Sequence, residues 1–214
     1  MSEVIWNNST EILIKSLGEK SLSLSWLHSQ CEKRYTYFNN YLAIPSIILS
    51  TITGAGSIGF NDIQNVSFIM GAISIFVSII STLNSFFSFA KRAESHRITA
   101  ISYSKLYLQI NIELALPRDK RMKVKEFMKN VSEQIQRLNE IQPQLADAII
   151  KFYNIKFKDE PNTISKPECV NGLSEIKIFN EEEIKNEIVN DIPQPLIVER
   201  QRALKEISKK PVFH

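Results

Sequence analysis

The sequence predicts an all-α membrane protein with a two-helix transmembrane hairpin, a cytosolic helical bundle or coiled coil, and a small C-terminal tail. Two observations predict this class. The chain is 23% charged, yet no Asp, Glu, Lys or Arg occurs between Arg34 and Asp62 or between Asp62 and Lys91. Evenly spread charge rarely leaves two such gaps side by side. Outside the gaps, apolar residues recur at helical spacing among many charged ones.

The two uncharged segments are long enough to cross a bilayer. We predict spans at about 41–59 and 66–90, because a helix needs about 20 largely apolar residues to cross a hydrocarbon core of about 30 Å. Only a short turn around Asp62 joins the spans, so the two helices must be antiparallel. The alternative is a hairpin buried in a soluble helical bundle, which requires more surrounding protein than the chain supplies.

The positions of lysine and arginine orient the predicted hairpin. Lys33 and Arg34 precede the first span, Lys91 and Arg92 follow the second, and the turn contains no basic residue. Because cytoplasmic flanks carry the excess of Lys and Arg, both termini are expected in the cytosol and the turn outside. Asp62 belongs at the far interface, since a carboxylate inside the bilayer is costly.

Small hydroxyl residues recur along both predicted spans. Their spacing alternates between three and four residues, which keeps them on one side of a helix. We call this set the hydroxyl stripe: Ser46, Ser50, Thr53, Ser57, Ser74, Ser78, Ser81 and Ser85. The favoured interpretation is tight helix packing, in which hydroxyls bond across the interface or to the carbonyl four residues back. The other interpretation is that the stripe lines a narrow aqueous path once several hairpins assemble.

The segment before the hairpin, residues 1–40, predicts cytosolic or interfacial helices. Leucine and isoleucine recur there at a broken helical spacing, and Gly18 is the expected break between two pieces. Trp26, together with tyrosines such as Tyr37 before the first span, suits a belt at the membrane–water interface.

The segment after the hairpin, residues 91–155, predicts a cytosolic helical region whose first helix ends before Pro117. An amphipathic stripe follows from Val124 to Gln142 and must be buried against another helix, most simply residues 98–115. Residues 156–214 are predicted to be a linker and a C-terminal tail with one short strand and two helices.

No catalytic or ligand-binding motif is present in the sequence. The three histidines do not have the spacing of metal ligands: they are His28, His96 and His214. The two cysteines lie too far apart in the sequence to suggest a disulfide framework. Phosphate loops, nucleophile elbows and dinucleotide turns do not occur. The basic residues form no nucleic-acid-binding pattern. We therefore predict a protein that is not an enzyme and has no cofactor, no metal and no specific nucleic-acid partner.

Two sequence blocks carry a family resemblance. The first reads Ile44-Pro-Ser-Ile-Ile-Leu-Ser-Thr-Ile-Thr-Gly54 and is preceded by Trp26-Leu-His28. The second reads Lys91-Arg-Ala-Glu-Ser-His-Arg97 and is followed by Tyr103. With these blocks, roughly residues 10–150 resemble the SLATT domain. Proteins of that family are two-helix membrane effectors found beside nucleotide-signalling enzymes and SLOG sensors in prokaryotic conflict systems, with relatives in large DNA viruses.

The resemblance implies an oligomeric two-span effector that permeabilises or perturbs a membrane in response to a cytosolic signal, with a signalling or sensor protein as partner. It also implies a juxtamembrane cluster that joins the cytosolic helices to the spans: Arg92, Glu94, His96, Arg97 and Tyr103. Without the resemblance, His96 is a packed or solvated helix residue. The alternative function is a non-conducting structural hairpin that scaffolds a membrane, a virion or a protein complex.

Overall fold

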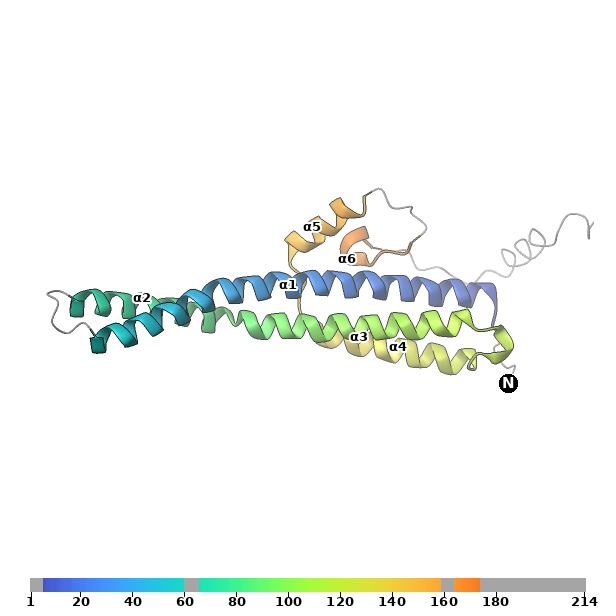
Figure 1. Ribbon diagram of the computed structural model, residues 1–214. Helices are drawn as coiled ribbons and strands as arrows, with labels where there is room; N and C mark the ends of the chain where they lie inside the picture. Colours follow the sequence, from blue (N-terminus) through green and yellow to red (C-terminus); the bar gives the residue numbers. More distant parts are fainter. Residues whose placement is uncertain (1–5, 60–65, 159–163, 174–214) are drawn as a thin grey trace, which may run out of the picture.

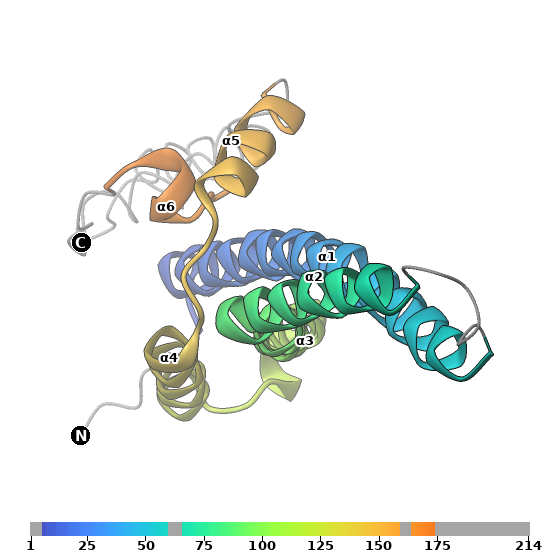
Figure 2. The ribbon, with the colours of Figure 1, turned by 90° about the vertical axis from the view of Figure 1, so that its left-hand side faces the viewer.

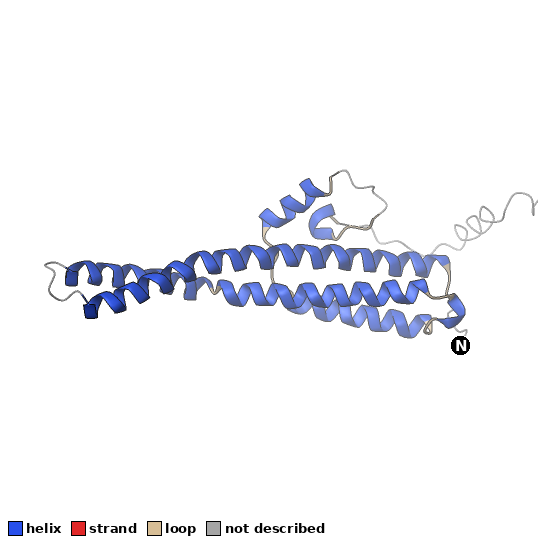
Figure 3. Ribbon diagram, viewed as in Figure 1, coloured by secondary structure: helices blue, strands red, loops and turns tan. Residues whose placement is uncertain are grey.

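The computed structural model describes residues 6–59, 66–158 and 164–173. Within these ranges the chain forms helices and no strand (Figure 3). Helix α1 (Asn8–Gly59) runs along almost the whole length of an elongated molecule (Figure 1). The all-helical class is therefore confirmed for this part of the chain. Residues 174–214, where the sequence predicts a strand and two helices, lie outside the described residues.

Helix α1 is continuous, and the expected break at Gly18 is wrong. Its 52 residues extend for about 78 Å at about 1.5 Å per residue. Gly18 lies where α1 and α3 (Phe89–Ala115) approach closely, because a Cβ added there would be 3.0 Å from Cγ2 of Ile110. The glycine therefore permits close helix packing and does not end a helix.

Local hydrogen bonds define where α1 begins. The amide of Thr10 donates to Oδ1 of Asn7 at 2.8 Å, and the amide of Asn7 donates to Oγ1 of Thr10 at 3.1 Å. These bonds satisfy donors that the first turn of a helix leaves unpaired. Glu11 lies in the same turn, where a negative charge is favourable.

Helix α2 (Val66–Phe87) lies beside the last turns of α1 and leads into α3 (Figure 1). Ser88 separates α2 from α3 with φ 49° and ψ 44°, a left-handed conformation that ends a regular helix. The second apolar helix thus ends at Phe87, three residues before the predicted boundary at Ala90.

A three-helix core forms where α1 and α3 pack with α4 (Val124–Ile141), after the short helix η1 (Arg118–Lys120). The prediction that the amphipathic stripe of residues 124–142 packs against residues 98–115 is confirmed. The buried core consists of Trp6, Ile14, Tyr103, Leu106, Ile110, Val124, Phe127, Val131 and Leu138. This core holds together the part of the molecule from which the apolar helices extend.

Two short helices, α5 (Asp147–Lys156) and α6 (Glu168–Asn171), lie on the side of α1 opposite α4 (Figures 1 and 2). Trp26 packs here, with its ring centroid 5.5 Å from that of Tyr153 and 5.1 Å from that of Phe157. Trp26 is half-buried by α5 and the residue after it, so contacts within the chain account for its position, and the interfacial aromatic belt stays a prediction.

One helix among the described residues is long and apolar enough to cross a membrane, counted from Val66 to Ala115 through Ser88. Its most apolar window of 18 residues has a mean hydropathy of 2.2, and none of that window is buried. The core helix of a soluble protein can match this length and composition, but such a helix is mostly covered by its neighbours. The exposure of the window favours membrane association.

Candidate functional site

The hydroxyl stripe meets across the hairpin at one point. Oγ of Ser46 on α1 lies 3.0 Å from Oγ of Ser81 on α2, and Ser46 is buried. A hydrogen bond between two small side chains lets the two helix backbones approach closely, as is common where helices pack in membranes. This pair supports the packing interpretation for one member of the stripe on each helix.

Three other members of the stripe on α2 are not covered by α1. Ser74, Ser78 and Ser85 are exposed. The half-buried residues of α2 form a neighbouring row: Val66, Met70, Ile73, Val77, Ile80 and Asn84. In a single copy of the chain, the hydroxyl stripe of α2 therefore lies beside the face that contacts α1. The side chain of Ser57, another predicted member, lies outside the described residues.

Three hydroxyls of the stripe are bonded within their own helices. Ser50 donates to the carbonyl of Ser46 at 2.8 Å, Thr53 to that of Leu49 at 2.8 Å, and Ser78 to that of Ser74 at 2.9 Å. Such bonds to the carbonyl four residues back spare the hydroxyl from needing water or another helix. The exposed Ser50 and Ser78 can therefore face lipid, a second helix or water without an unpaired donor.

Asn84 is the most polar side chain on the α1-facing row of α2. Its Oδ1 is buried and has no hydrogen-bond partner among the described residues. An unpaired amide oxygen in such a place costs free energy. Because residue 84 lies one turn before Ser88, this cost falls at the end of α2 that leads into α3 and the three-helix core.

The structure divides the predicted juxtamembrane cluster into two parts. Arg92, Glu94 and Arg97 are exposed. Arg97 donates two hydrogen bonds to the carboxylate of Glu94, at 2.7 and 2.6 Å, and these bonds lower the pKa of Glu94. An exposed pair one helical turn apart contributes little to stability. These three side chains lie on the exposed face of α3 and take no part in the packing against α1.

The other part of the cluster is buried between α1 and α3. Nδ1 of His96 lies 2.9 Å from Nδ1 of His28, and both rings are almost fully buried. The Tyr103 ring stacks on His28 with centroids 5.9 Å apart, and its hydroxyl donates to Oδ1 of Asn139 at 2.9 Å. We call His28 and His96 the histidine pair. It joins the two helices that lead into the hairpin.

Burial keeps the histidine pair neutral near pH 7. It lowers the pKa of His28 and is the largest cause that lowers the pKa of His96 to about 4, followed by the charges of His28 and Arg92. Burial also raises the pKa of Tyr103 to about 12. The site therefore contains polar but uncharged groups, which is the state that a buried hydrogen-bonded pair requires.

The sequence does not predict the contact between the two histidines, because they are 68 residues apart. One feature of the sequence could have predicted their contact. His28 and His96 each fall on the buried face of a helix, and a buried imidazole needs a hydrogen-bond partner. Among the described residues, no group of three His, Cys, Asp or Glu could hold a metal ion. The contact between the two rings is a hydrogen bond.

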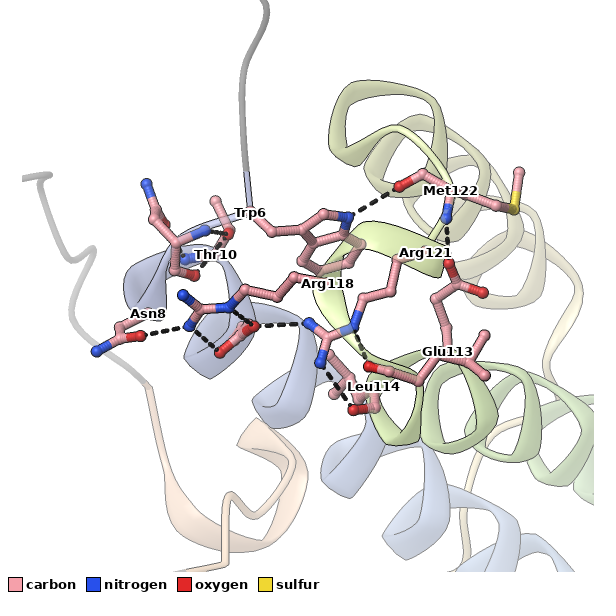
Figure 4. A network of polar contacts seen from close by, with 11 residues as sticks. Trp6, Asn8, Thr10, Glu113, Leu114, Arg118, Arg121 and Met122 are labelled. Carbon is pink, nitrogen blue, oxygen red and sulfur yellow. Dashed lines mark hydrogen bonds and ion pairs between the residues drawn. The ribbon is translucent and has the colours of Figure 1, made fainter.

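A second polar network closes the end of the bundle far from the hairpin (Figure 4). Arg121 donates to Glu11 at 2.6 Å and to the carbonyls of Leu114 and Leu116 at 2.9 and 2.8 Å. Its guanidinium also lies 4.9 Å from the ring centroid of Trp6. Arg118 donates two further bonds to Glu11, and these are the largest cause that lowers the pKa of Glu11 to about 2.

Substituting Arg121→Ala is expected to destabilise the bundle by about 2–4 kcal/mol, because it removes one partner of a network that is largely shielded from water. The side chain of Arg121 is 9% exposed, whereas that of Arg118 is 51% exposed. The matched control Arg118→Ala should therefore cost about 1 kcal/mol or less. Urea unfolding followed by circular dichroism measures both changes. Equal losses would contradict the assignment of Arg121 as the central residue.

Comparisons with protein-family models, curated proteins and solved structures find no match to this chain. The resemblance to the SLATT domain therefore rests on the two sequence blocks and stays a prediction. The structure places the first block in the α1 arm of the hairpin and the second at the start of α3. His28 and His96, which lie in the segments that carry the resemblance, are hydrogen-bonded to each other.

Proposed function

We propose that this chain is a two-span membrane effector with both termini in the cytosol. The end of α1 and all of α2 cross the bilayer, and the cytosolic bundle of α1, α3 and α4 receives a signal from another protein. Several copies assemble and permeabilise the membrane. This proposal combines the apolar, uncovered surface of α2 with the basic residues that flank both predicted spans.

The observation that carries the permeabilising role is the exposure of Ser74 and Ser78 on α2. Because they lie beside the row that contacts α1, copies arranged around an axis can bring these hydroxyls together without opening the hairpin. Walls lined by hydroxyls hold water more readily than walls of isoleucine or phenylalanine. Assembly also has support outside the hairpin, since α3 leaves an apolar row exposed: Ile98, Ile101, Leu108 and Ile112.

Dye release from vesicles that contain the full chain tests this role. The wild-type chain is expected to release the dye, and the combined change Ser74→Leu and Ser78→Leu should reduce release to that of empty vesicles while the chain stays inserted. Ile75→Leu with Ile79→Leu is the matched control on the adjoining face and should leave release unchanged. If the serine variant releases dye as the wild type does, the stripe does not line the path.

A non-conducting scaffold is the second candidate function. It is favoured by the hydrogen bonds from Ser78 and Thr82 to the carbonyls four residues earlier, which let these hydroxyls pack or face lipid without water. In that case the wild-type chain retains the dye at every protein-to-lipid ratio. The same serine substitutions would then change only the assembly of the chain, which cross-linking measures.

A further inference from the structure

The hydrogen-bond geometry assigns a tautomer to each ring of the histidine pair. Nε2 of His28 lies 3.3 Å from Oε1 of Gln142, which can only accept, so this nitrogen carries the hydrogen. The orientation of Gln142 agrees, because its Nε2 donates to Oδ1 of Asn139 at 3.3 Å. Nδ1 of His28 therefore has the free lone pair, and Nδ1–H of His96 donates to it across 2.9 Å.

We propose that the histidine pair is a proton-operated latch between α1 and α3, closed when both rings are neutral and open when they take up protons. Added protons have two places to bind. One added proton leaves an N–H···N bond between the two Nδ1 atoms, because the hydrogen of His96 can move to Nε2 and free its Nδ1 to accept, but it puts a positive charge in a site from which water is nearly excluded. A second proton leaves N–H groups on both Nδ1 atoms, which face each other, and breaks the bond.

The groups around the pair do not compensate such a charge. On α1 the neighbours are Cys31, whose pKa burial raises, and Tyr35, whose ring stacks on His96. On α3, Arg92 adds a like charge, while the carboxylate of Glu94 is exposed and bonded to Arg97.

Among the described residues, α4, α5 and α6 add no negative group to the pair at neutral pH. The end of α4 and the residue after it contribute the amides of Asn139 and Gln142. Helix α5 contributes Tyr153, and Cys169 of α6, whose pKa burial raises, interacts electrostatically with Tyr103. The carboxylate of Glu32, one turn after His28 on α1, interacts with Arg97. Protonation of the pair therefore destabilises the closed arrangement.

The position of the latch links it to the apolar helices. His28 lies on α1 before the first predicted span, and His96 lies on α3 two turns after Ser88. The pair therefore joins α1 to α3 on the side of the predicted spans that leads into the three-helix core. Opening would free these arms to move apart and would give the effector an acid trigger. That consequence rests on the proposed function, whereas the latch itself can be tested without it.

Amide hydrogen exchange of the full chain in lipid nanodiscs tests the latch. With a pKa of about 6.5 in the open state and about 4 in the closed state for His96, the opening equilibrium at pH 5.0 should rise about 30-fold over pH 7.5. After correction for intrinsic exchange, the rise should be confined to residues 24–35 and 92–103. His28→Gln with His96→Gln should abolish it, and the matched control His214→Gln should preserve it.

An unchanged exchange rate at pH 5.0, or an equal rise in the double variant, would overturn the latch. If the double variant does not fold, the ¹⁵N signals of the wild-type rings decide instead. The latch requires both rings to be neutral at pH 6.0 and to take up protons over the pH range in which amide exchange rises. Rings that titrate near pH 6.5 without a change in amide exchange would refute it. Dye release at pH 7.5 tests the permeabilising role separately, so failure of one does not imply failure of the other.

Discussion

Replacing Ile75 and Ile79 by arginine is expected to remove the chain from the membrane fraction. Both residues are more than half exposed on α2 and contribute little to packing within one copy. Arginine near the centre of a spanning helix costs about 2.5–3.5 kcal/mol, so two cost roughly 5–7 kcal/mol. Carbonate extraction of membranes followed by immunoblotting measures the change.

The control places the same charges on α3, outside the predicted spans. Leu108 and Ile112 on α3 are equally exposed, and their replacement by arginine should leave the chain in the membrane pellet. If α2 were part of a soluble bundle, the wild-type chain would appear in the carbonate supernatant. In that case the arginines at positions 75 and 79 would only make the surface more polar.

Replacing Phe127 by alanine is expected to destabilise the bundle of α1, α3 and α4 by about 3–5 kcal/mol. Phe127 is 1% exposed, lies in the core shared by α1, α3 and α4, and its ring centroid is 6.0 Å from that of Trp6. The cavity cannot be refilled by a neighbour without moving one of three helices. Unfolding by urea in detergent, followed by tryptophan fluorescence, measures the loss.

The matched control is Phe152→Ala on α5. Phe152 is 46% exposed and stacks on Trp26 with centroids 5.9 Å apart. Its removal should cost about 1 kcal/mol, the value of one exposed aromatic pair. Similar losses from the two substitutions would mean that α4 does not belong to the folding core, contrary to the three-helix arrangement.

The helical pattern of the sequence was enough to predict the packing of α4 against α3. The stripe that begins at Val124 and includes Phe127 lies among charged residues, so only one face of α4 could be buried, and α3 was the nearest long helix in the chain. The same reasoning failed at Gly18, because local preference does not distinguish a glycine that ends a helix from one that lets Ile110 approach.

Other features depend on contacts that a single sequence does not contain. The histidine pair requires knowing that α1 and α3 lie side by side in a register that brings His28 to His96. Spacing predicted that the hydroxyl stripe of α2 lies on one side of the helix. It did not predict that Ser81 contacts Ser46 while Ser74 and Ser78 lie beside the interface.

Labelling of an engineered cysteine from outside intact cells tests the transmembrane hairpin most directly. In a Cys169→Ser background, the remaining Cys31 is buried. If both termini are in the cytosol, Asp62→Cys reacts with a membrane-impermeant maleimide before lysis, whereas Glu140→Cys on α4 reacts only after lysis. If both cysteines react only after lysis, the turn does not lie outside the cell, and the transmembrane hairpin is contradicted.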